Sequence, residues 1–410
     1  MEYISVKEAA TIKPFIDKYR MSLILTAALC TVLALALLVR PPKSPESVTV
    51  RSQNGVYDLT GIVDLDETLI RLTPTDTYYP NTYLSPEAAG EAIPESTLSH
   101  EEIRANYLSQ RFVLRLPDNS TVYRLTFSLS GRHAMRVFVN GSMAAQTGRP
   151  GKTKQDTEVW ENNITFNAAA QNGKMEIILH SAQFYHAKRG ASLGSLILSK
   201  SGTVPDPFSF GRIKGMAVAG TFMCAAVLLM GVYLLLSRTK ATLYFALSCV
   251  VMALRECLQS QAWTYFPING NLSFMLEYLS VVLLTIFLSL YLGQYPTSRF
   301  LRGVQYTAIL CSCVYGLLVV LGDSIFYTSV LKYYQMLLVL CIVPGIAGLF
   351  WNMRGPTKEQ GAAIYGIAVF FIAAVSDILM YSDIFGESPN APISEIAMLV
   401  FVLAQTVSLF

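Results

Sequence analysis

The chain of 410 residues is 52% hydrophobic and only 14% charged. This excludes a soluble protein of two or three domains, in which about a quarter of the residues carry charge. The formal net charge of +3 is small, and Lys and Arg lie mostly at the ends of apolar runs, so a nucleic-acid partner is not expected. The composition indicates an integral membrane protein whose surface is covered largely by lipid.

The first apolar run covers residues 22–39 and follows a polar segment, 1–21. It is long enough to cross a hydrocarbon core of about 30 Å at 1.5 Å per residue. A cleaved signal peptide is the alternative. The run has no small-residue cleavage pattern, and the basic, proline-rich stretch at 40–43 follows it directly. We therefore expect an uncleaved anchor helix after a cytoplasmic amino terminus.

Seven further apolar runs follow Pro205, at 215–236, 241–260, 273–294, 303–321, 329–351, 361–381 and 393–410. They predict a seven-helix transmembrane bundle over residues 212–410. The last run reaches Phe410 without a basic flank or a stop signal, so we expect the native chain to continue into a cytoplasmic module.

Basic residues predict the orientation, because short loops rich in Lys and Arg stay in the cytoplasm. Alternate turns carry the pairs Arg238 and Lys240, Arg299 and Arg302, and Arg354 and Lys358. The turns between them have no basic residue. We therefore expect both ends of the chain in the cytoplasm and the polar region outside the cell. Arg40, Lys43, Arg212 and Lys214 lie on the expected outer side, where a large translocated domain weakens the rule.

The polar region between residues 50 and 203 changes to a period of two, which predicts strands. Tyr123, Leu125 and Phe127 alternate with polar residues, and "KMEIILH" and "SLGSLILS" read as further strands. Asn140-Gly141 between "MRVFV" and "SMAAQT" predicts a tight hairpin turn. Many short strands with turn signals between them predict a sandwich of two sheets.

The order of features resembles bacterial seven-transmembrane receptors with diverse intracellular signalling modules. The strings that carry the resemblance are "VYDLTGI" (56–62), "YYPNTYLSP" (78–86), "VFVNGSMAAQTGRPG" (137–151), "FYHAKRGASLGSLILS" (184–199) and "MGVYLLLSRTKATLYFALSCVVMALR" (230–255). The resemblance covers roughly residues 50–410. It implies an α + β membrane protein with an extracellular jelly-roll, galactose-binding-like domain at 50–203. The expected anchor departs from the cleaved signal that is usual in that family.

Such a family implies a receptor that senses an extracellular ligand, for example a carbohydrate, and passes the signal to a histidine kinase or a diguanylate cyclase. One alternative is an accessory or binding membrane protein that modulates a partner without its own effector, and another is a transporter. Residues 1–410 contain no motif of a catalytic site, so we expect neither an enzyme nor a cofactor in this part. The expected partners are membrane lipid, a small polar or carbohydrate ligand, a second copy in a homodimer, and a cytoplasmic effector domain or partner.

Six ionisable residues fall within the outer half of the apolar runs, where a charge costs about 2.5–3.5 kcal/mol on insertion scales. They are Arg255, Glu256, Glu277, Lys332, Asp377 and Glu395. We predict a charged cup beneath the jelly-roll, in which Arg255 and Lys332 pair with Glu277, Asp377 or Glu256. The alternative is that some of the six snorkel to the interface and others form structural ion pairs.

A sugar site in the polar region would need an aromatic platform and hydrogen-bonding groups in a cleft. The candidates are Trp160, Arg149, Arg132, Tyr185 and His186. Core or interface packing of Trp160 and Tyr185 is the alternative. The four histidines are scattered and the seven cysteines lie in apolar runs, so no metal site is expected.

Overall fold

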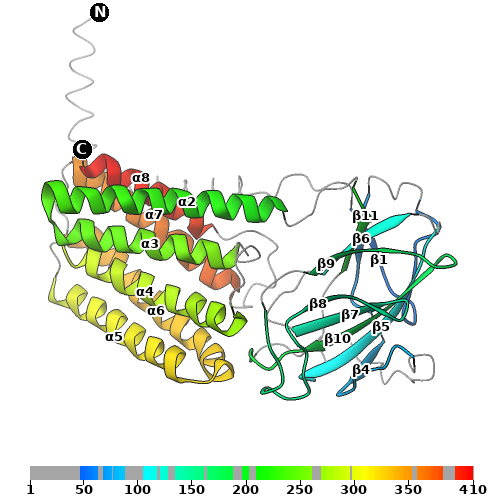
Figure 1. Ribbon diagram of the computed structural model, residues 1–410. Helices are drawn as coiled ribbons and strands as arrows, with labels where there is room; N and C mark the ends of the chain where they lie inside the picture. Colours follow the sequence, from blue (N-terminus) through cyan, green and yellow to red (C-terminus); the bar gives the residue numbers. More distant parts are fainter. Residues whose placement is uncertain are drawn as a thin grey trace, which may run out of the picture.

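The computed structural model describes residues 47–62, 68–75, 77–87, 105–117, 121–127, 134–160, 164–187, 196–202, 209–260, 269–295, 298–352, 358–381 and 393–409. Strands occupy residues 47–200 and helices follow from residue 209. The strands form a β-domain at one end of an elongated molecule, and the helices form a bundle that extends away from it (Figure 1). The anchor predicted at 22–39 lies outside the described residues.

Two sheets make up the β-domain. The first has the order β1 (Ser47–Val50), β3 (Leu69–Leu72), β11 (Leu196–Lys200), β6 (Val122–Phe127) and β9 (Ile164–Ala169). The second has the order β2 (Val56–Asp58), β5 (Tyr107–Arg115), β10 (Lys174–Ala182), β7 (Ala134–Val139) and β8 (Ser142–Thr147), and β4 (Tyr78–Pro80) pairs with β5. Two pairs, β1 with β3 and β2 with β5, are parallel.

A single apolar core joins the two sheets. Leu125 of β6 and Leu198 of β11 come from the first sheet, and Leu114 of β5 and Ile177 of β10 come from the second, and all four side chains are fully buried. The predicted alternation is confirmed, because Tyr123, Leu125 and Phe127 all face this core. A period of two places every second side chain on the same face of a strand, so one face becomes the core and the other stays polar.

The hairpin predicted at Asn140-Gly141 is present between β7 and β8. Both residues have positive φ, 48° for Asn140 and 83° for Gly141. Such a turn matches the right-handed twist of the flanking strands, and Asn and Gly tolerate this conformation best.

A helix lies at each of the seven apolar runs after Pro205. They are α2 (Ser209–Val232, continued by a π-helical turn, Tyr233–Ser237), α3 (Lys240–Gln259), α4 (Gly270–Leu292), α5 (Arg299–Leu321), α6 (Ser324–Asn352), α7 (Lys358–Tyr381) and α8 (Ser394–Leu409). Five of them, α2 to α6, are long and apolar enough to cross a membrane. Within the described residues, α7 and α8 contain shorter apolar stretches, Ile364–Leu379 and Ser394–Gln405.

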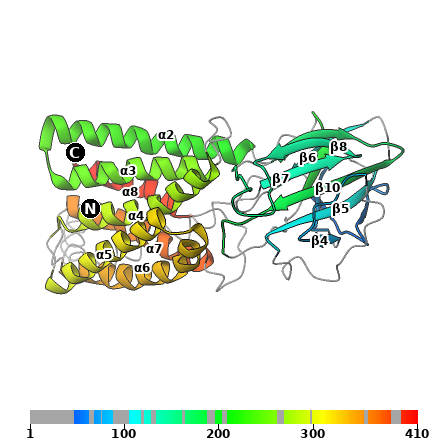
Figure 2. The ribbon, with the colours of Figure 1, turned by 60° about the horizontal axis from the view of Figure 1, so that its bottom comes forward.

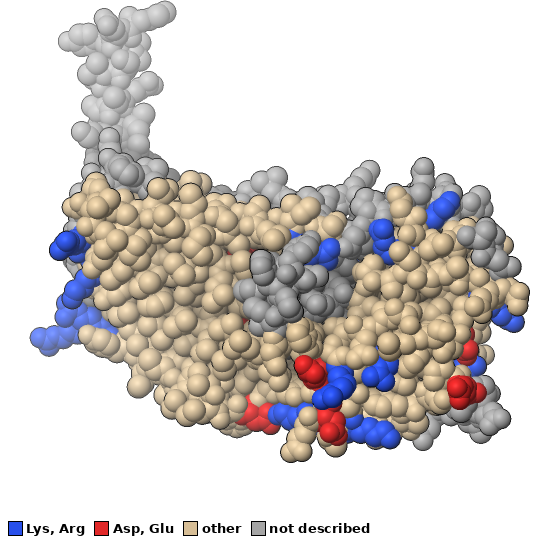
Figure 3. All heavy atoms as spheres, in the orientation of Figure 1, with Lys and Arg blue, Asp and Glu red and all other residues tan. Residues whose placement is uncertain are grey.

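Short connections make consecutive helices run in opposite directions along the bundle (Figures 1 and 2). We call the end next to the β-domain the proximal end and the opposite end the distal end. The α5–α6 turn, with Gly322 and Asp323, is proximal, whereas the turn from α2 to α3 at Arg238 and Thr239 is distal. Figure 3 shows Lys and Arg side chains at the distal end and an almost uncharged surface along the visible face of the bundle.

Candidate functional site

A cavity of about 840 Å³ lies within the bundle. Helices α3 to α8 contribute to its wall, and the segment that follows β10 adds His186 and Ala187. Its size falls within the range of about 300–1,000 Å³ that is usual for small-molecule sites. The cavity is therefore large enough for a ligand, and the β-domain forms part of its boundary.

The structure brings the six predicted charges together, because all of them line this cavity. They come from α3 (Arg255 and Glu256), α4 (Glu277), α6 (Lys332), α7 (Asp377) and α8 (Glu395). Each residue lies within a few turns of the proximal end of its helix, so the polar part of the cavity faces the β-domain. The sequence missed the neutral polar residues of the lining, such as Gln259, Gln335 and Thr328.

Arg255 contacts helix α4. Its Nη1 donates to the Ser280 hydroxyl at 3.3 Å and lies 3.5 Å from the backbone carbonyl oxygen of Glu277. The Ser280 hydroxyl donates to the same carbonyl at 2.6 Å. Within the described part of the chain, the close polar contacts of this guanidinium are therefore with neutral acceptors rather than with a carboxylate, unlike the ion pair that we predicted.

Glu256 is the most deeply buried of the six, with 2% of its surface exposed. Its Oε1 atom has no hydrogen-bond partner among the described residues. A buried carboxylate oxygen without a donor costs free energy, because the water that it loses is not replaced. Glu256 therefore lines the cavity and carries a buried acceptor that no described residue satisfies.

Asp377 has a different role from the predicted pairing with a cation. Its two carboxylate oxygens accept hydrogen bonds from the backbone N–H groups of Ile393 at 3.0 Å and Ser394 at 2.8 Å. These groups lie at the start of α8, where the first N–H groups have no partner within the helix. Asp377 therefore caps α8 from the neighbouring helix, and its negative charge also suits the positive end of the helix dipole.

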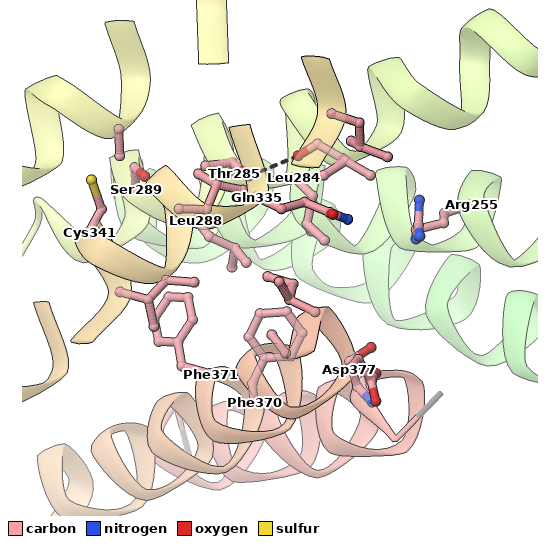
Figure 4. Close-up of a pocket in the computed structure, with 18 of the residues that line it drawn as sticks. Arg255, Leu284, Thr285, Leu288, Ser289, Gln335, Cys341, Phe370, Phe371 and Asp377 are labelled. Carbon is pink, nitrogen blue, oxygen red and sulfur yellow. Dashed lines mark hydrogen bonds between the residues drawn. The ribbon is translucent and has the colours of Figure 1, made fainter. Parts of the chain in front are cut away.

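The rest of the cavity is largely apolar. Leu284, Leu288 and Leu292 follow one another along α4, and Phe370 and Phe371 of α7 lie across from them. In Figure 4, Arg255 and Asp377 lie at one end of the cavity, whereas Cys341, Ser289 and Phe371 lie toward the other. The cavity is thus amphipathic along its length, charged at the proximal end and mainly apolar further in, where Ser289 and Gln305 add neutral polar groups.

Helices α6 and α7 pack loosely against each other, in contrast to the close packing of α7 against α8. Both contribute to the wall of the cavity, α6 with Gly345 and Ile346 and α7 with Phe371 and Ala374. Among the helices that follow one another in the chain, α6 and α7 are the pair that packs least closely within the described residues.

An ion pair links the β-domain to the bundle. Lys154, in the loop between β8 and β9, donates to the carboxylate of Asp323 in the α5–α6 turn. This hydrogen bond holds the pKa of the Asp323 carboxyl below its usual value. Figure 3 shows acidic and basic side chains next to one another at the junction of the two parts.

Two hydrogen bonds from backbone N–H groups add to this junction. The N–H of Gly270, at the start of α4, donates to the carbonyl of Val159 at 3.0 Å, and the N–H of Ala187 donates to the Thr328 hydroxyl at 3.2 Å. A Cβ at Gly270 would lie only 2.4 Å from the carbonyl oxygen of Val159, so the approach of the two backbones requires glycine here. The loop that precedes β9 and the segment after β10 therefore dock on the proximal end of the bundle.

The residues proposed for a sugar site each make different contacts in the structure. The half-buried Trp160 donates from Nε1 to Glu158 at 3.1 Å, and Arg149 is exposed and pairs with Glu158 through its backbone. The Tyr185 hydroxyl lies 3.1 Å from the backbone carbonyl oxygens of Lys154 and Thr157. It therefore stabilises the loop between β8 and β9, which we call the docking loop. Among the candidates that the structure describes, only His186 lines the bundle cavity. Arg132 lies outside the described residues.

His180 is buried inside the β-domain. Its Nε2 lies 2.8 Å from the carbonyl oxygen of Leu84, and its ring stacks on that of Tyr83 with the centroids 4.8 Å apart. Burial lowers the pKa of His180. The geometry is that of a histidine held in the core.

Comparison with known proteins finds no family model that matches the chain and no matching curated protein.

Proposed function

We propose that the chain is a bacterial transmembrane signalling receptor. An extracellular jelly-roll domain senses a ligand, and the helices pass the signal to a cytoplasmic output such as a histidine kinase or a diguanylate cyclase. The observation that carries the proposal is that His186 and Ala187 of the β-domain form part of the wall of the bundle cavity. A movement of the β-domain thereby changes the surroundings of the charged residues between the helices.

The strand order supports a jelly-roll. Four strands, β3, β11, β6 and β9, lie next to one another in one sheet, and four more, β5, β10, β7 and β8, in the other. Eight strands in two sheets with repeated crossings between the sheets are typical of this architecture. Strands β1, β2 and β4 extend the sheets.

The distribution of basic residues supports an extracellular position of the β-domain. Arg238 and Lys240 lie at the distal α2–α3 turn, and Arg299 and Arg302 lie at the distal start of α5. Because short basic turns remain in the cytoplasm, this pattern favours a cytoplasmic distal end and an outer β-domain.

The test of the proposal follows the path from the docking loop to the distal turns. Hydrogen exchange is measured by mass spectrometry on the full chain in lipid nanodiscs, for the wild type and for Lys154→Glu. A receptor predicts faster exchange at the α5–α6 turn and also at residues 233–240 and 293–302. Lys152→Glu, an exposed change in the same loop, serves as the matched control and leaves both regions unchanged.

A response that stops at the α5–α6 turn would count against transmission and would favour an accessory membrane protein that acts on a partner directly.

The ligand is sought by thermal stabilisation of the full chain with a panel of glycans and small metabolites, because a specific ligand raises the apparent stability by mass action. For a sugar in the β-domain, Trp160→Ala is expected to abolish the stabilisation.

A further inference from the structure

We infer that the bundle cavity holds one tail of a zwitterionic membrane lipid, whose headgroup carries a phosphate and a primary amine. The lipid belongs to the leaflet next to the β-domain. The lipid is thus the ligand class of the bundle cavity in the proposed receptor. Only an effect of this lipid on signalling rests on the proposed function.

The first support is the direction of polarity. Along α4 the lining residues run from Glu277 to Leu292, a length of about 22 Å at 1.5 Å per residue. The charged end lies at the proximal end of the bundle, and the apolar end reaches inward past Leu284 and Leu288. A lipid of the proximal leaflet has the same polarity, with its headgroup at the membrane surface and its tail toward the middle of the bilayer.

The second support is a route of entry from the membrane. The cavity is bounded by α6 and α7, which pack loosely, and a Cβ at Gly345 of α6 would meet no atom within 4 Å. The neighbouring α6 residues Leu340 and Val343 are 73% and 55% exposed, so this helix presents its apolar side chains outward. A lipid tail can therefore enter sideways between α6 and α7 without passing through water.

The third support is the unfilled acceptor at Glu256. Its Oε1 lacks a hydrogen-bond donor within the described residues, although the residue is only 2% exposed and lines the cavity. A primary ammonium carries three N–H donors and a positive charge, so it satisfies both the hydrogen bond and the charge. A quaternary ammonium has no N–H donor and would leave this oxygen without a hydrogen bond.

The fourth support is the cationic part of the same wall. Arg255 contacts the neutral Ser280 hydroxyl and the carbonyl of Glu277, and Lys332 is an exposed residue whose Nζ lies 5.0 Å from the ring centroid of Tyr333. A guanidinium fork and an ammonium are the groups that bind phosphate in proteins. A headgroup that carries both a phosphate and an amine matches the two signs of charge.

The test uses the full chain in detergent with equal amounts of three lipids that have the same palmitoyl and oleoyl tails. These are phosphatidylethanolamine, phosphatidylcholine and phosphatidylglycerol, and native mass spectrometry counts the lipids that stay bound. The ethanolamine lipid is expected to be retained about tenfold better than the choline lipid, as one charge-assisted hydrogen bond implies. Glu256→Gln removes this preference, because its neutral amide attracts the ammonium less strongly.

Cavity-filling variants test the tail. Gly345→Phe and Ala374→Phe are expected to reduce the retention of the ethanolamine lipid severalfold. Gly303→Phe is the matched control, because Gly303 is an exposed helical glycine with no atom within 4 Å of its Cβ position and does not line the cavity. Glycerophosphoethanolamine, the same headgroup without tails, is expected not to compete.

Equal retention of the ethanolamine and choline lipids by the wild type would overturn the assignment, as would wild-type retention in both cavity-filling variants. Competition by the soluble headgroup would overturn the role of the tail. Size-exclusion profiles and thermal unfolding in lipid-free detergent verify that each variant is folded. Selective lipid binding together with no exchange response in Lys154→Glu would leave this inference standing and would count against the receptor.

Discussion

At the scale of single residues, charged groups in the apolar helices have distinct tasks. Asp377 caps a helix, Arg255 contacts α4 from α3, and Glu256 carries a buried acceptor without a donor among the described residues. The sequence could predict that these residues gather, because a buried charge needs polar surroundings and all of them lie at similar depth. It could not predict the contact of each side chain, since these depend on the rotation of every helix about its axis.

Asp377→Ala is expected to loosen the start of α8. The two N–H groups that the carboxylate satisfies would lose their acceptor, at a cost of about 0.5–2 kcal/mol for a lost cap. Faster hydrogen exchange at residues 393–397 in the full chain measures this effect. Asp377→Asn keeps one side-chain oxygen and should have a smaller effect, and equal exchange in all three proteins would contradict the capping role.

The stability of the β-domain is expected to fall as the pH drops below about 6.5, the ordinary pKa of histidine. Burial lowers the pKa of His180 in the folded state, so the unfolded chain binds a proton first and is favoured as the pH decreases. Calorimetry of the β-domain transition at pH 7.5 and 5.5 measures the decrease. His180→Phe should flatten the pH dependence, whereas His186→Phe should retain it.

At the scale of elements, the sequence predicted the positions of helices and strands well. The seven apolar runs after Pro205 and the alternating strands near Leu114 and Leu125 reappear in the structure, because burial in lipid or between sheets imposes these periods directly. The docking of the segments near Val159 and Ala187 was not predicted. Such contacts join loops through single backbone groups and leave no periodic pattern in the sequence.

Gly270→Ala is expected to weaken the junction between α4 and the β-domain. The added methyl group would overlap the carbonyl of Val159, and overpacking of this kind costs about 1–3 kcal/mol. Faster tryptic cleavage after Lys154 reports the opening of the junction. Gly220→Ala adds the same group on an open face of α2 and should leave the cleavage rate unchanged.

At the scale of the whole molecule, the β-domain and the bundle are linked by an ion pair and by backbone hydrogen bonds. Lys154 and Asp323 lie far apart in the sequence, so their pairing follows only from the final arrangement of the two parts. The resemblance to a receptor family led us to expect a sensor above a bundle. The composition alone indicated only a membrane protein with a polar region.

The charge swap Lys154→Glu with Asp323→Lys is expected to restore the docking that either single reversal weakens. Both side chains are partly exposed, at 38% and 53%, so the coupling energy should be about 0.2–1 kcal/mol. A double-mutant cycle on the rate of tryptic cleavage within residues 148–160 measures it, scored at sites that all four proteins share. If the free-energy changes that the cleavage rates give for the two single variants add up to that of the double variant, the ion pair contributes nothing to docking.

The two sheets of the sandwich are attached to the bundle in different ways. Strand β11, which precedes α2 in the chain, belongs to the first sheet, whereas β10, which precedes the segment with Ala187, belongs to the second. The first sheet is therefore joined to α2 by the chain itself, the second contacts the bundle through a hydrogen bond at Ala187, and the loop between β8 and β9 connects both sheets to the helix ends. If one sheet slides over the other, α2 is expected to tilt relative to the remaining helices while both parts stay folded.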